Sequence, residues 1–323
     1  MKKTLVICAT TLAMTCSGLS MAETYGIGTN QQGSLFYSMG AALSKTMVEI
    51  TGDQYRVSPY AGSSTYIPML NAGRLAFGLS NGGETTFAYL GMENFEGRAN
   101  KNLRLVGAVI PTQTSFAVPT NSDVQSIEDL KGKRVPSGYN SGRTFHFYSN
   151  AALASGFVNI DDTRKVPTPN FVTALSALEE NRVDAALVPM NVGAGKKAMA
   201  TMSDGWRYIS LNDNELARAE VEKNLPSARI VSMKPSASLT GVVENPTNMI
   251  EVDFFLITGA DVSDDVVYKL VKTMASNKAA LAKSFGAFNR YIPENMVQKN
   301  VVPYHPGAIK AYKEMGIWPA DSK

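Results

Sequence analysis

The chain repeats one pattern at an offset of about 110 residues. The segment GTNQQGSLFYSMGAAL (28–43) aligns with GYNSGRTFHFYSNAAL (138–153), and each contains a glycine, a polar loop, a hydroxyl residue and the same Ala-Ala-Leu. Further along, LNAGRLAFGLSN (70–81) aligns with LEENRVDAALVP (178–189), and each predicts a helix end, an arginine turn and a buried strand. Two copies of one pattern predict two lobes built to the same plan.

Each copy predicts the order strand, helix, strand, helix, strand, which is the βαβαβ unit of an α/β fold. The elements expected in the first copy are Thr24–Gly28, Ser34–Thr51, Gln54–Pro59, Ser64–Ala72 and Leu75–Ser80. The elements expected in the second copy are Lys133–Pro136, Thr144–Ser155, Arg164–Val166, Phe171–Glu180 and Val183–Val188. We therefore expect an α/β fold with two βαβαβ lobes.

The last part of the chain predicts a return to the first lobe. Residues 252–275 have the pattern of a strong strand, a turn and a helix, whereas Ala287–Lys323 is rich in proline and predicts irregular structure. The chain would then cross between the lobes near 112–116 and again near 249–253. The expected lobes are 23–113 plus 252–323 (lobe I) and 114–251 (lobe II), joined by a two-strand hinge.

The first 22 residues, MKKTLVICATTLAMTCSGLSMA, have the pattern of a secretory signal peptide. Lys2 and Lys3 precede a short apolar run, and Ser20-Met21-Ala22 is a small-x-small cleavage pattern. A lipid anchor at Cys16 is the alternative, but AMTC lacks the branched apolar residue expected before a lipidated cysteine. We expect cleavage after Ala22 and a mature protein in the periplasm.

The composition of the mature chain excludes several classes of function. Cleavage would remove both cysteines, Cys8 and Cys16, so that the core alone must stabilise the exported chain. Loss of Lys2 and Lys3 would reduce the formal net charge from +3 to +1, and a nearly neutral surface argues against nucleic acids and anionic membranes. No later apolar run approaches the roughly 20 residues of a transmembrane helix. We expect a monomer of two lobes.

Polar side chains gather at the expected strand ends, where open α/β sheets bind their ligands. The segments at these ends are GTNQQGS, YAGSSTY, SNGGE, GYNSGRT, TPNF and MNVG. Hydroxyls, amides and glycines dominate them, and their charged residues are Glu84 and Arg143. The candidate ligand-binding residues are Thr29, Gln32, Ser34, Tyr37, Ser63, Ser64, Asn81, Asn140, Ser141, Arg143, Thr144 and Asn191.

These segments offer little for catalysis, which needs a group that titrates or attacks. The chain has two histidines: His305 lies between prolines and suits a structural role, and His146 lies inside a helix. For His146 we favour a core or surface role, and lining of a cleft is the alternative. Neither has the spacing of a metal site. We expect a binding protein with no catalytic residue, no metal and no cofactor.

The glycines near the start of the mature chain raise the possibility of a nucleotide loop. Gly26 and Gly28 are followed by Gly33, which is too late for a dinucleotide fingerprint, and Ser34-Leu35 follows in place of a lysine and a hydroxyl residue. An ordinary tight turn leaves the polar residues unexplained. We therefore interpret this loop as part of a site for a small polar solute.

Four motifs, in order along the chain, resemble the TAXI family of solute receptors, which serve TRAP transporters. They are GTNQQGSLFYSMG, AGSSTYIPMLNAGRLAFGLSN, DLKGKRVPSGYNSGRT and VPYHPGAIKAYKEMGIW. The resemblance implies a periplasmic-binding-protein fold of the type II kind that closes on a small organic acid. It also implies delivery of this acid to a TRAP-type membrane permease. Dicarboxylates, 2-oxoacids and acidic amino acids such as glutamate are the implied ligands.

The chain departs from the family pattern at positions in the expected cleft. Arg143 replaces a glycine, Phe36 the first tyrosine of a pair, and Tyr66 an asparagine. Arg143 directly precedes an expected helix, where helix N–H groups already favour an anion, so we expect it to anchor a carboxylate. A solvated turn residue is the alternative for Arg143. A receptor for an ABC importer and, less favoured, a periplasmic enzyme are the alternatives for the protein.

Overall fold

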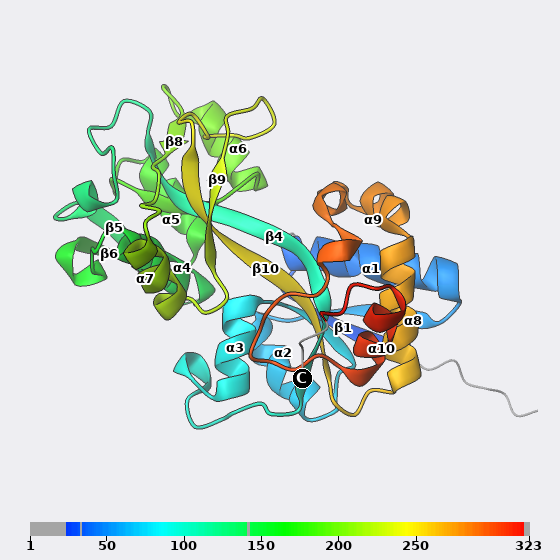
Figure 1. The fold of residues 1–323 in the computed structure, drawn as a ribbon. Helices are drawn as coiled ribbons and strands as arrows, with labels where there is room; N and C mark the ends of the chain where they lie inside the picture. Colours follow the sequence, from blue (N-terminus) through cyan, green and yellow to red (C-terminus); the bar gives the residue numbers. More distant parts are fainter. Residues whose placement is uncertain (1–23, 33, 141–142, 320–323) are drawn as a thin grey trace, which may run out of the picture.

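Two long antiparallel strands, β4 (Leu103–Pro119) and β10 (Thr247–Gly259), run through the middle of the molecule and connect two α/β lobes (Figure 1). The computed structural model describes residues 24–32, 34–140 and 143–319. The expected signal peptide, residues 1–22, lies outside the described residues. Helices α1–α3 and α8–α10 surround one end of the strand pair, and helices α4–α7 surround the other end (Figure 1).

Lobe I contains the first βαβαβ unit and the C-terminal helices. The sheet order here is β2-β1-β3-β10-β4; β1 is parallel to β2 and β3, whereas β10 is antiparallel to β3. The remaining elements are β1 (Thr24–Thr29), α1 (Leu35–Thr51), β2 (Gln54–Pro59), α2 (Ser63–Asn71), β3 (Phe77–Asn81), α3 (Gly82–Leu90), η1 (Glu93–Phe95), α8 (Asp264–Ser276), α9 (Lys278–Ser284), η4 (Gly286–Arg290), η5 (Pro293–Asn295) and α10 (Pro306–Glu314).

Lobe II contains the second unit. Strand β5 is parallel to β6, β7 and β8 pair with β4, and β9 pairs with β10. The elements are η2 (Glu128–Leu130), β5 (Arg134–Gly138), α4 (Thr144–Ser155), η3 (Ile160–Asp162), β6 (Arg164–Thr168), α5 (Phe171–Glu179), β7 (Ala186–Pro189), α6 (Gly193–Thr201), β8 (Trp206–Tyr208), α7 (Glu215–Asn224) and β9 (Arg229–Met233).

Helix α1 shows why these segments fold as the sequence predicts. Ser34 caps the helix by accepting a hydrogen bond from the Tyr37 N–H at 3.1 Å. Met39, Leu43 and Met47, at a spacing of four residues, are fully buried against the sheet. The helix ends at Gly52, whose φ of 76° is a left-handed conformation that glycine adopts without strain.

The expected α/β fold of two βαβαβ lobes with a two-strand hinge is confirmed. Strand β2 and helix α4 have the predicted bounds. The expectation of irregular structure throughout Ala287–Lys323 is wrong, because this region contains helix α10. Pro306 occupies the first turn of α10, where a missing N–H costs nothing, and His305 caps the helix. Within the described residues, the structure has no helix with the length and apolar character needed to cross a membrane.

His305 gives this part of the fold a pH-dependent stability. Its side chain is fully buried, its Nδ1 accepts a hydrogen bond from the Gly307 N–H at 3.2 Å, and burial lowers its pKa. The unfolded chain therefore binds a proton more readily than the folded chain. The stabilising contribution is complete above the unfolded pKa of about 6.5 and is lost as the pH falls through the lowered folded pKa.

We expect His305→Asn to keep the cap while removing the titration. Its free energy of unfolding, measured by urea titration, should fall less than that of the wild type between about pH 7.5 and 5. His305→Ala removes the cap and should cost about 1 kcal/mol at the upper pH. An equal pH dependence in the wild type and the asparagine variant would contradict this assignment.

Candidate functional site

The N-termini of α2, α3 and α4 meet where the two lobes touch. Helices α2 and α3 follow strands of lobe I, and α4 follows β5 of lobe II. Exposed N–H groups and the helix dipole make such ends favourable for negative charge. The side chain that occupies this position is the carboxyl group of Glu84, in the first turn of α3.

Glu84 joins the three helix ends through one oxygen. Its Oε2 accepts hydrogen bonds from Ser63 Oγ at 2.5 Å, from Thr144 Oγ1 at 3.2 Å and from Asn81 Nδ2 at 3.3 Å. The Glu84 N–H in turn donates to Asn81 Oδ1 at 2.8 Å, so Asn81 caps α3 and uses its whole amide on Glu84. Glu84 therefore links Ser63 of lobe I to Thr144 of lobe II.

Burial determines the electrostatics of Glu84. The residue is 5% exposed, and burial raises the pKa of its carboxyl group, although hydrogen bonds from Ser63 and Thr144 act in the opposite direction. The pKa values of Tyr66 and Tyr148 are also raised, mainly by burial and further by the nearby Glu84. We call the contact region between the lobes around Ser63, Glu84 and Thr144 the seam. A negative charge in the seam is poorly solvated.

Apolar contacts close the seam next to Glu84. The rings of Phe87 in α3 and Phe147 in α4 lie with their centroids 4.8 Å apart. A Cβ atom on Gly83 would lie 2.5 Å from Leu225 Cδ1, so glycine allows α3 to approach the α7–β9 loop closely. Helix α3 therefore packs on lobe II along its first two turns.

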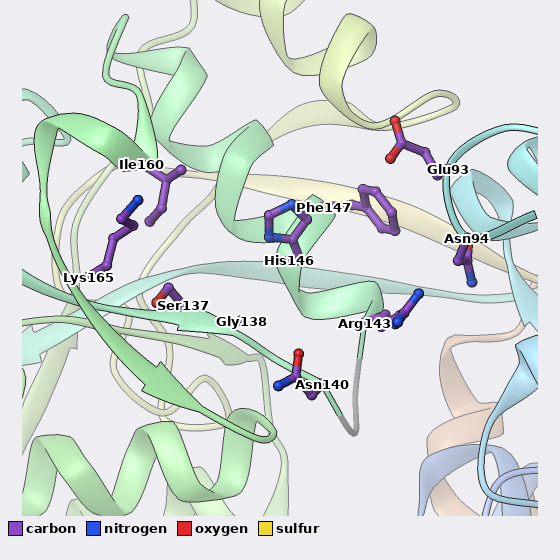
Figure 2. A pocket seen from close by; sticks show the side chains of 10 residues that line it. All are labelled: Glu93, Asn94, Ser137, Gly138, Asn140, Arg143, His146, Phe147, Ile160 and Lys165. Atoms are coloured by element: carbon purple, nitrogen blue, oxygen red, sulfur yellow. The ribbon is translucent and has the colours of Figure 1, made fainter. Parts of the chain in front are cut away.

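A pocket with a volume of about 480 Å³ opens beside this seam (Figure 2). Its lining comes from the end of β5, from α4, from η1 of lobe I and from the η3–β6 region. The lining residues are Glu93, Asn94, Ser137, Gly138, Asn140, Arg143, His146, Phe147, Ile160 and Lys165. Arg143 extends from the start of α4 toward the side of the pocket where Asn94 lies (Figure 2). The pocket combines cationic groups with the apolar surfaces of Phe147 and Ile160.

Some polar groups of the pocket already bind other side chains of the protein, and others do not. Lys165 Nζ pairs with Asp161 Oδ1 at 2.6 Å, and His146 Nε2 lies 3.2 Å from Asn150 Nδ2. Arg143 is exposed, and no ion pair is recorded for it among the described residues. Of the cations that line the pocket, Arg143 is therefore the most available to a ligand.

The structure brings some of the candidate residues together. Asn140 and Arg143 line the pocket, and Ser63, Asn81 and Thr144 bind Glu84. Ser141 lies outside the described residues. The other candidates are not among the described residues that line this pocket; they are Thr29, Gln32, Ser34, Tyr37, Ser64 and Asn191.

The positions of these remaining candidates differ in exposure. Thr29 is buried and donates to the carbonyl of Asn30, whereas Gln32 and Ser64 are exposed. Ser34 caps α1 next to the half-buried Tyr37. Asn191 has a φ of 60°, and its Oδ1 is buried without a partner among the described residues. Thr29 is the last residue of β1, and Tyr37 and Ser64 lie in the first turns of α1 and α2. Gln32, Ser34 and Asn191 lie on loops that follow a strand, as the sequence predicts.

Sequence reasoning noted Glu84 at a strand end but did not select it as a site residue. The Asn81-x-x-Glu84 spacing is a capping signature that would have placed Glu84 in the first turn of a helix. The pocket residues Asn94 and Lys165 were also missed, because they come from segments distant in the sequence from Arg143. Among the described residues, no group of three or more His, Asp or Glu side chains could hold a metal ion.

Removal of the Glu84 charge should change the pH dependence of stability. An acid whose folded pKa is raised stabilises the fold fully below its unfolded pKa of about 4.3, and loses this contribution as the pH rises through the folded value. Glu84→Gln should therefore become more stable relative to the wild type as the pH rises from about 4 to 7. Glu84→Ala leaves the Ser63 and Thr144 hydroxyls without their acceptor and should cost about 1–3 kcal/mol.

Denaturant titrations at several pH values would measure both effects on Glu84. Glu96→Gln removes an exposed carboxylate two residues beyond the pocket lining and serves as the matched control. A stability difference between Glu84→Gln and the wild type that stays constant over this pH range would contradict the assignment.

Comparison with known proteins identifies a family for this chain and solved structures with a similar fold. Residues 27–316 match the model of the NMT1-like family. Among solved structures, PhnD1 from Prochlorococcus marinus in complex with methylphosphonate has a TM-score of 0.55 at 11% identity, covering 91% of this chain and 99% of that chain. XAC2383 from Xanthomonas citri bound to ATP has a TM-score of 0.53 at 9% identity, covering 91% and 96%.

The periplasmic aliphatic sulphonate binding protein SsuA from Escherichia coli has a TM-score of 0.51 at 15% identity, covering 91% of this chain and 90% of that chain. At these identities the likeness shows a shared fold, which is that of periplasmic binding proteins. Because the family match extends over most of the sequence, the chain belongs to the NMT1-like family.

Proposed function

We propose that this protein is a periplasmic receptor that binds a small organic acid between its lobes and delivers it to a membrane permease. The observation that carries the proposal is the pocket beside the interlobe seam, with Arg143 at its rim. The fold supports it, because two lobes joined by a pair of strands can enclose a solute. The polar groups at the strand ends suit binding rather than catalysis.

A carboxylate is the proposed partner of Arg143. The guanidinium can form a bidentate pair with a carboxylate, and Arg143 stands directly before α4, whose N-terminus also favours an anion. The lining of the same pocket also includes the ring of His146, Lys165, which pairs with Asp161, and the carboxylate of Glu93. The solved structures with this fold include proteins bound to methylphosphonate and ATP, which are also anions.

We propose a TRAP-type permease as the partner, on the basis of the four motifs that resemble TAXI receptors. A dicarboxylate, a 2-oxoacid or an acidic amino acid such as glutamate is the proposed solute. A receptor for an ABC importer would have the same fold and is the second candidate. The TRAP-type permease and the ABC importer can be distinguished by identifying the permease encoded beside this gene. Transport assays in reconstituted vesicles would then test the assignment.

Arg143→Ala should weaken binding by roughly 2–5 kcal/mol, because the carboxylate would lose its charged partner inside a closed cleft. This corresponds to at least a tenfold rise in the dissociation constant, at about 1.4 kcal/mol per decade. Isothermal titration calorimetry with L-glutamate, 2-oxoglutarate and succinate measures the change. Arg56→Ala, which removes an exposed arginine from β2, is the matched control and should bind as the wild type does.

A change below threefold in Arg143→Ala, with an unaltered melting temperature, would reject Arg143 as the anchor. Mass spectrometry of the solute released from purified, denatured protein tests the proposed function independently of this residue. Recovery of a cationic or uncharged solute would contradict an acid receptor.

The lobes should close around the solute by bending at the strand pair. We propose lobe boundaries at 23–113 plus 252–323 and at 114–251, which meet where Gln113 pairs with Glu251 and Thr112 with Val252. Solution scattering should give a smaller radius of gyration at a saturating concentration of the bound acid than in its absence. An unchanged scattering profile under saturation would count against closure.

A further inference from the structure

The hydrogen bond between Thr144 and Glu84 is a direct polar contact between the two lobes. Thr144 is the first residue of α4, and its Oγ1 donates to Glu84 Oε2 at 3.2 Å. Ser63 and Asn81 donate to the same oxygen from lobe I. If the lobes separate, Glu84 keeps the two donors of lobe I and loses the donor of lobe II. Separation would also bring water to the carboxyl group of a residue that is only 5% exposed in the seam.

The closed seam disfavours a negative charge on Glu84. Among the described residues, its carboxyl group has no cationic partner, and no charged side chain contributes to the shift of its pKa. The pKa is raised because burial removes water from the carboxylate, and the hydroxyl and amide donors offset this effect only in part. The seam is therefore a better environment for the neutral carboxyl group than for the charged one.

Other titratable and charged side chains lie on the elements that surround Glu84. Burial raises the pKa values of Tyr66 in α2 and Tyr148 in α4, so both phenols stay neutral below pH 8. The α7–β9 loop at 225–228 packs on the start of α3 and has no charged side chain. The titratable or charged side chains on η1, β10 and the start of α4 also include Glu93, Arg143, His146, Glu251 and Asp253. The two carboxylates of β10 pair with Arg229, and the other three side chains line the pocket.

We propose that Glu84 is a proton-dependent latch between the lobes, which holds the seam closed when its carboxyl group is neutral and releases it when the group is charged. A neutral carboxyl group is buried behind Thr144 at little cost, whereas a carboxylate gains hydration when the lobes separate. The latch requires the hinge motion of the proposed function, but it does not depend on which solute is bound.

Linkage determines the direction of the pH dependence. A group with a higher pKa in the closed state than in the open state stabilises closure fully below its open-state pKa, which is about 4.3 for a hydrated glutamate. This contribution is lost as the pH rises through the raised pKa of Glu84 in the seam. The fraction of closed molecules should therefore fall as the pH rises.

Energy transfer between two dyes measures this equilibrium in the absence of any solute. Both cysteines of the chain lie within the first 22 residues, so Ala99→Cys in lobe I and Glu222→Cys in lobe II give the exported chain two exposed labelling sites. The ratio of closed to open molecules should fall at least threefold as the pH rises from about 4.5 to 8. Circular dichroism at each pH verifies that the protein is folded.

Four variants of the labelled chain assign the effect. Glu84→Gln stays neutral and keeps an acceptor for Thr144, so the ratio should remain at the acid value of the wild type over the whole pH range. Thr144→Val removes the donor of lobe II and should lower the ratio at pH 4.5. Glu96→Gln removes an exposed carboxylate near the pocket, and His146→Gln removes the imidazole of α4. Both should keep the wild-type response to pH.

A ratio that is independent of pH in the wild type, or that changes equally in Glu84→Gln, would overturn the latch. A response that is lost in His146→Gln and kept in Glu84→Gln would also overturn it, since the titrating group would then lie in the pocket. Neither result affects the proposed receptor, because no solute is present. Failure of the proposed function is detected separately, by calorimetry and by mass spectrometry of the released solute.

Discussion

The antiparallel pairing of β4 with β10 is the interaction on which the rest of the structure depends. Each strand is long enough to belong to both lobes. The other strands of the large sheet lie on either side of this pair. β3 pairs with the lobe I half of β10, and β7 pairs with the lobe II half of β4. A change in the twist of these two strands would move every helix N-terminus of one lobe relative to the other.

Charged side chains stabilise this ladder at the level of the hinge. Arg229 binds Asp253, with Nη1 2.6 Å from Oδ2, and also binds Glu251. Glu251 accepts a hydrogen bond from Gln113 on the opposite strand, and Gln113 in turn accepts one from Arg290 at 3.1 Å. The network joins β9, β10, β4 and η4. Hydrogen bonds to ionised partners stabilise more than neutral ones, so the network favours one geometry of the strand pair.

The sequence predicted those features of the fold that depend on local patterns of residues. The bounds of α4 follow from its polar start and the glycine after its end, and α1 follows from its cap and its buried stripe. The repeat predicted two lobes because each βαβαβ unit is a local pattern. Helix α10 was missed because prolines around it suggested irregular structure, although one of them lies in the first turn of the helix, where proline is favoured.

The site was less predictable than the fold because it depends on contacts between distant segments. Glu84 and Thr144 are 60 residues apart in the sequence, and their hydrogen bond exists because α3 and α4 start at the same seam. Nothing in the local sequence of α4 indicates that Asn94 of η1 lines the same pocket as Arg143. Polar residues at strand ends predicted the region of the site, and tertiary structure determines which of them meet.

Each contact described between the lobes contributes little energy on its own. A hydrogen bond such as that between Thr144 and Glu84 contributes about 1 kcal/mol net, and an aromatic pair such as Phe87 and Phe147 about 0.5–1.5 kcal/mol beyond its buried area. A shift of a two-state equilibrium from 1:99 to 99:1 requires about 5.5 kcal/mol. Each of these two contacts is small on this scale, so a proposed solute that contacts both lobes would determine which state of the proposed two-state equilibrium is populated.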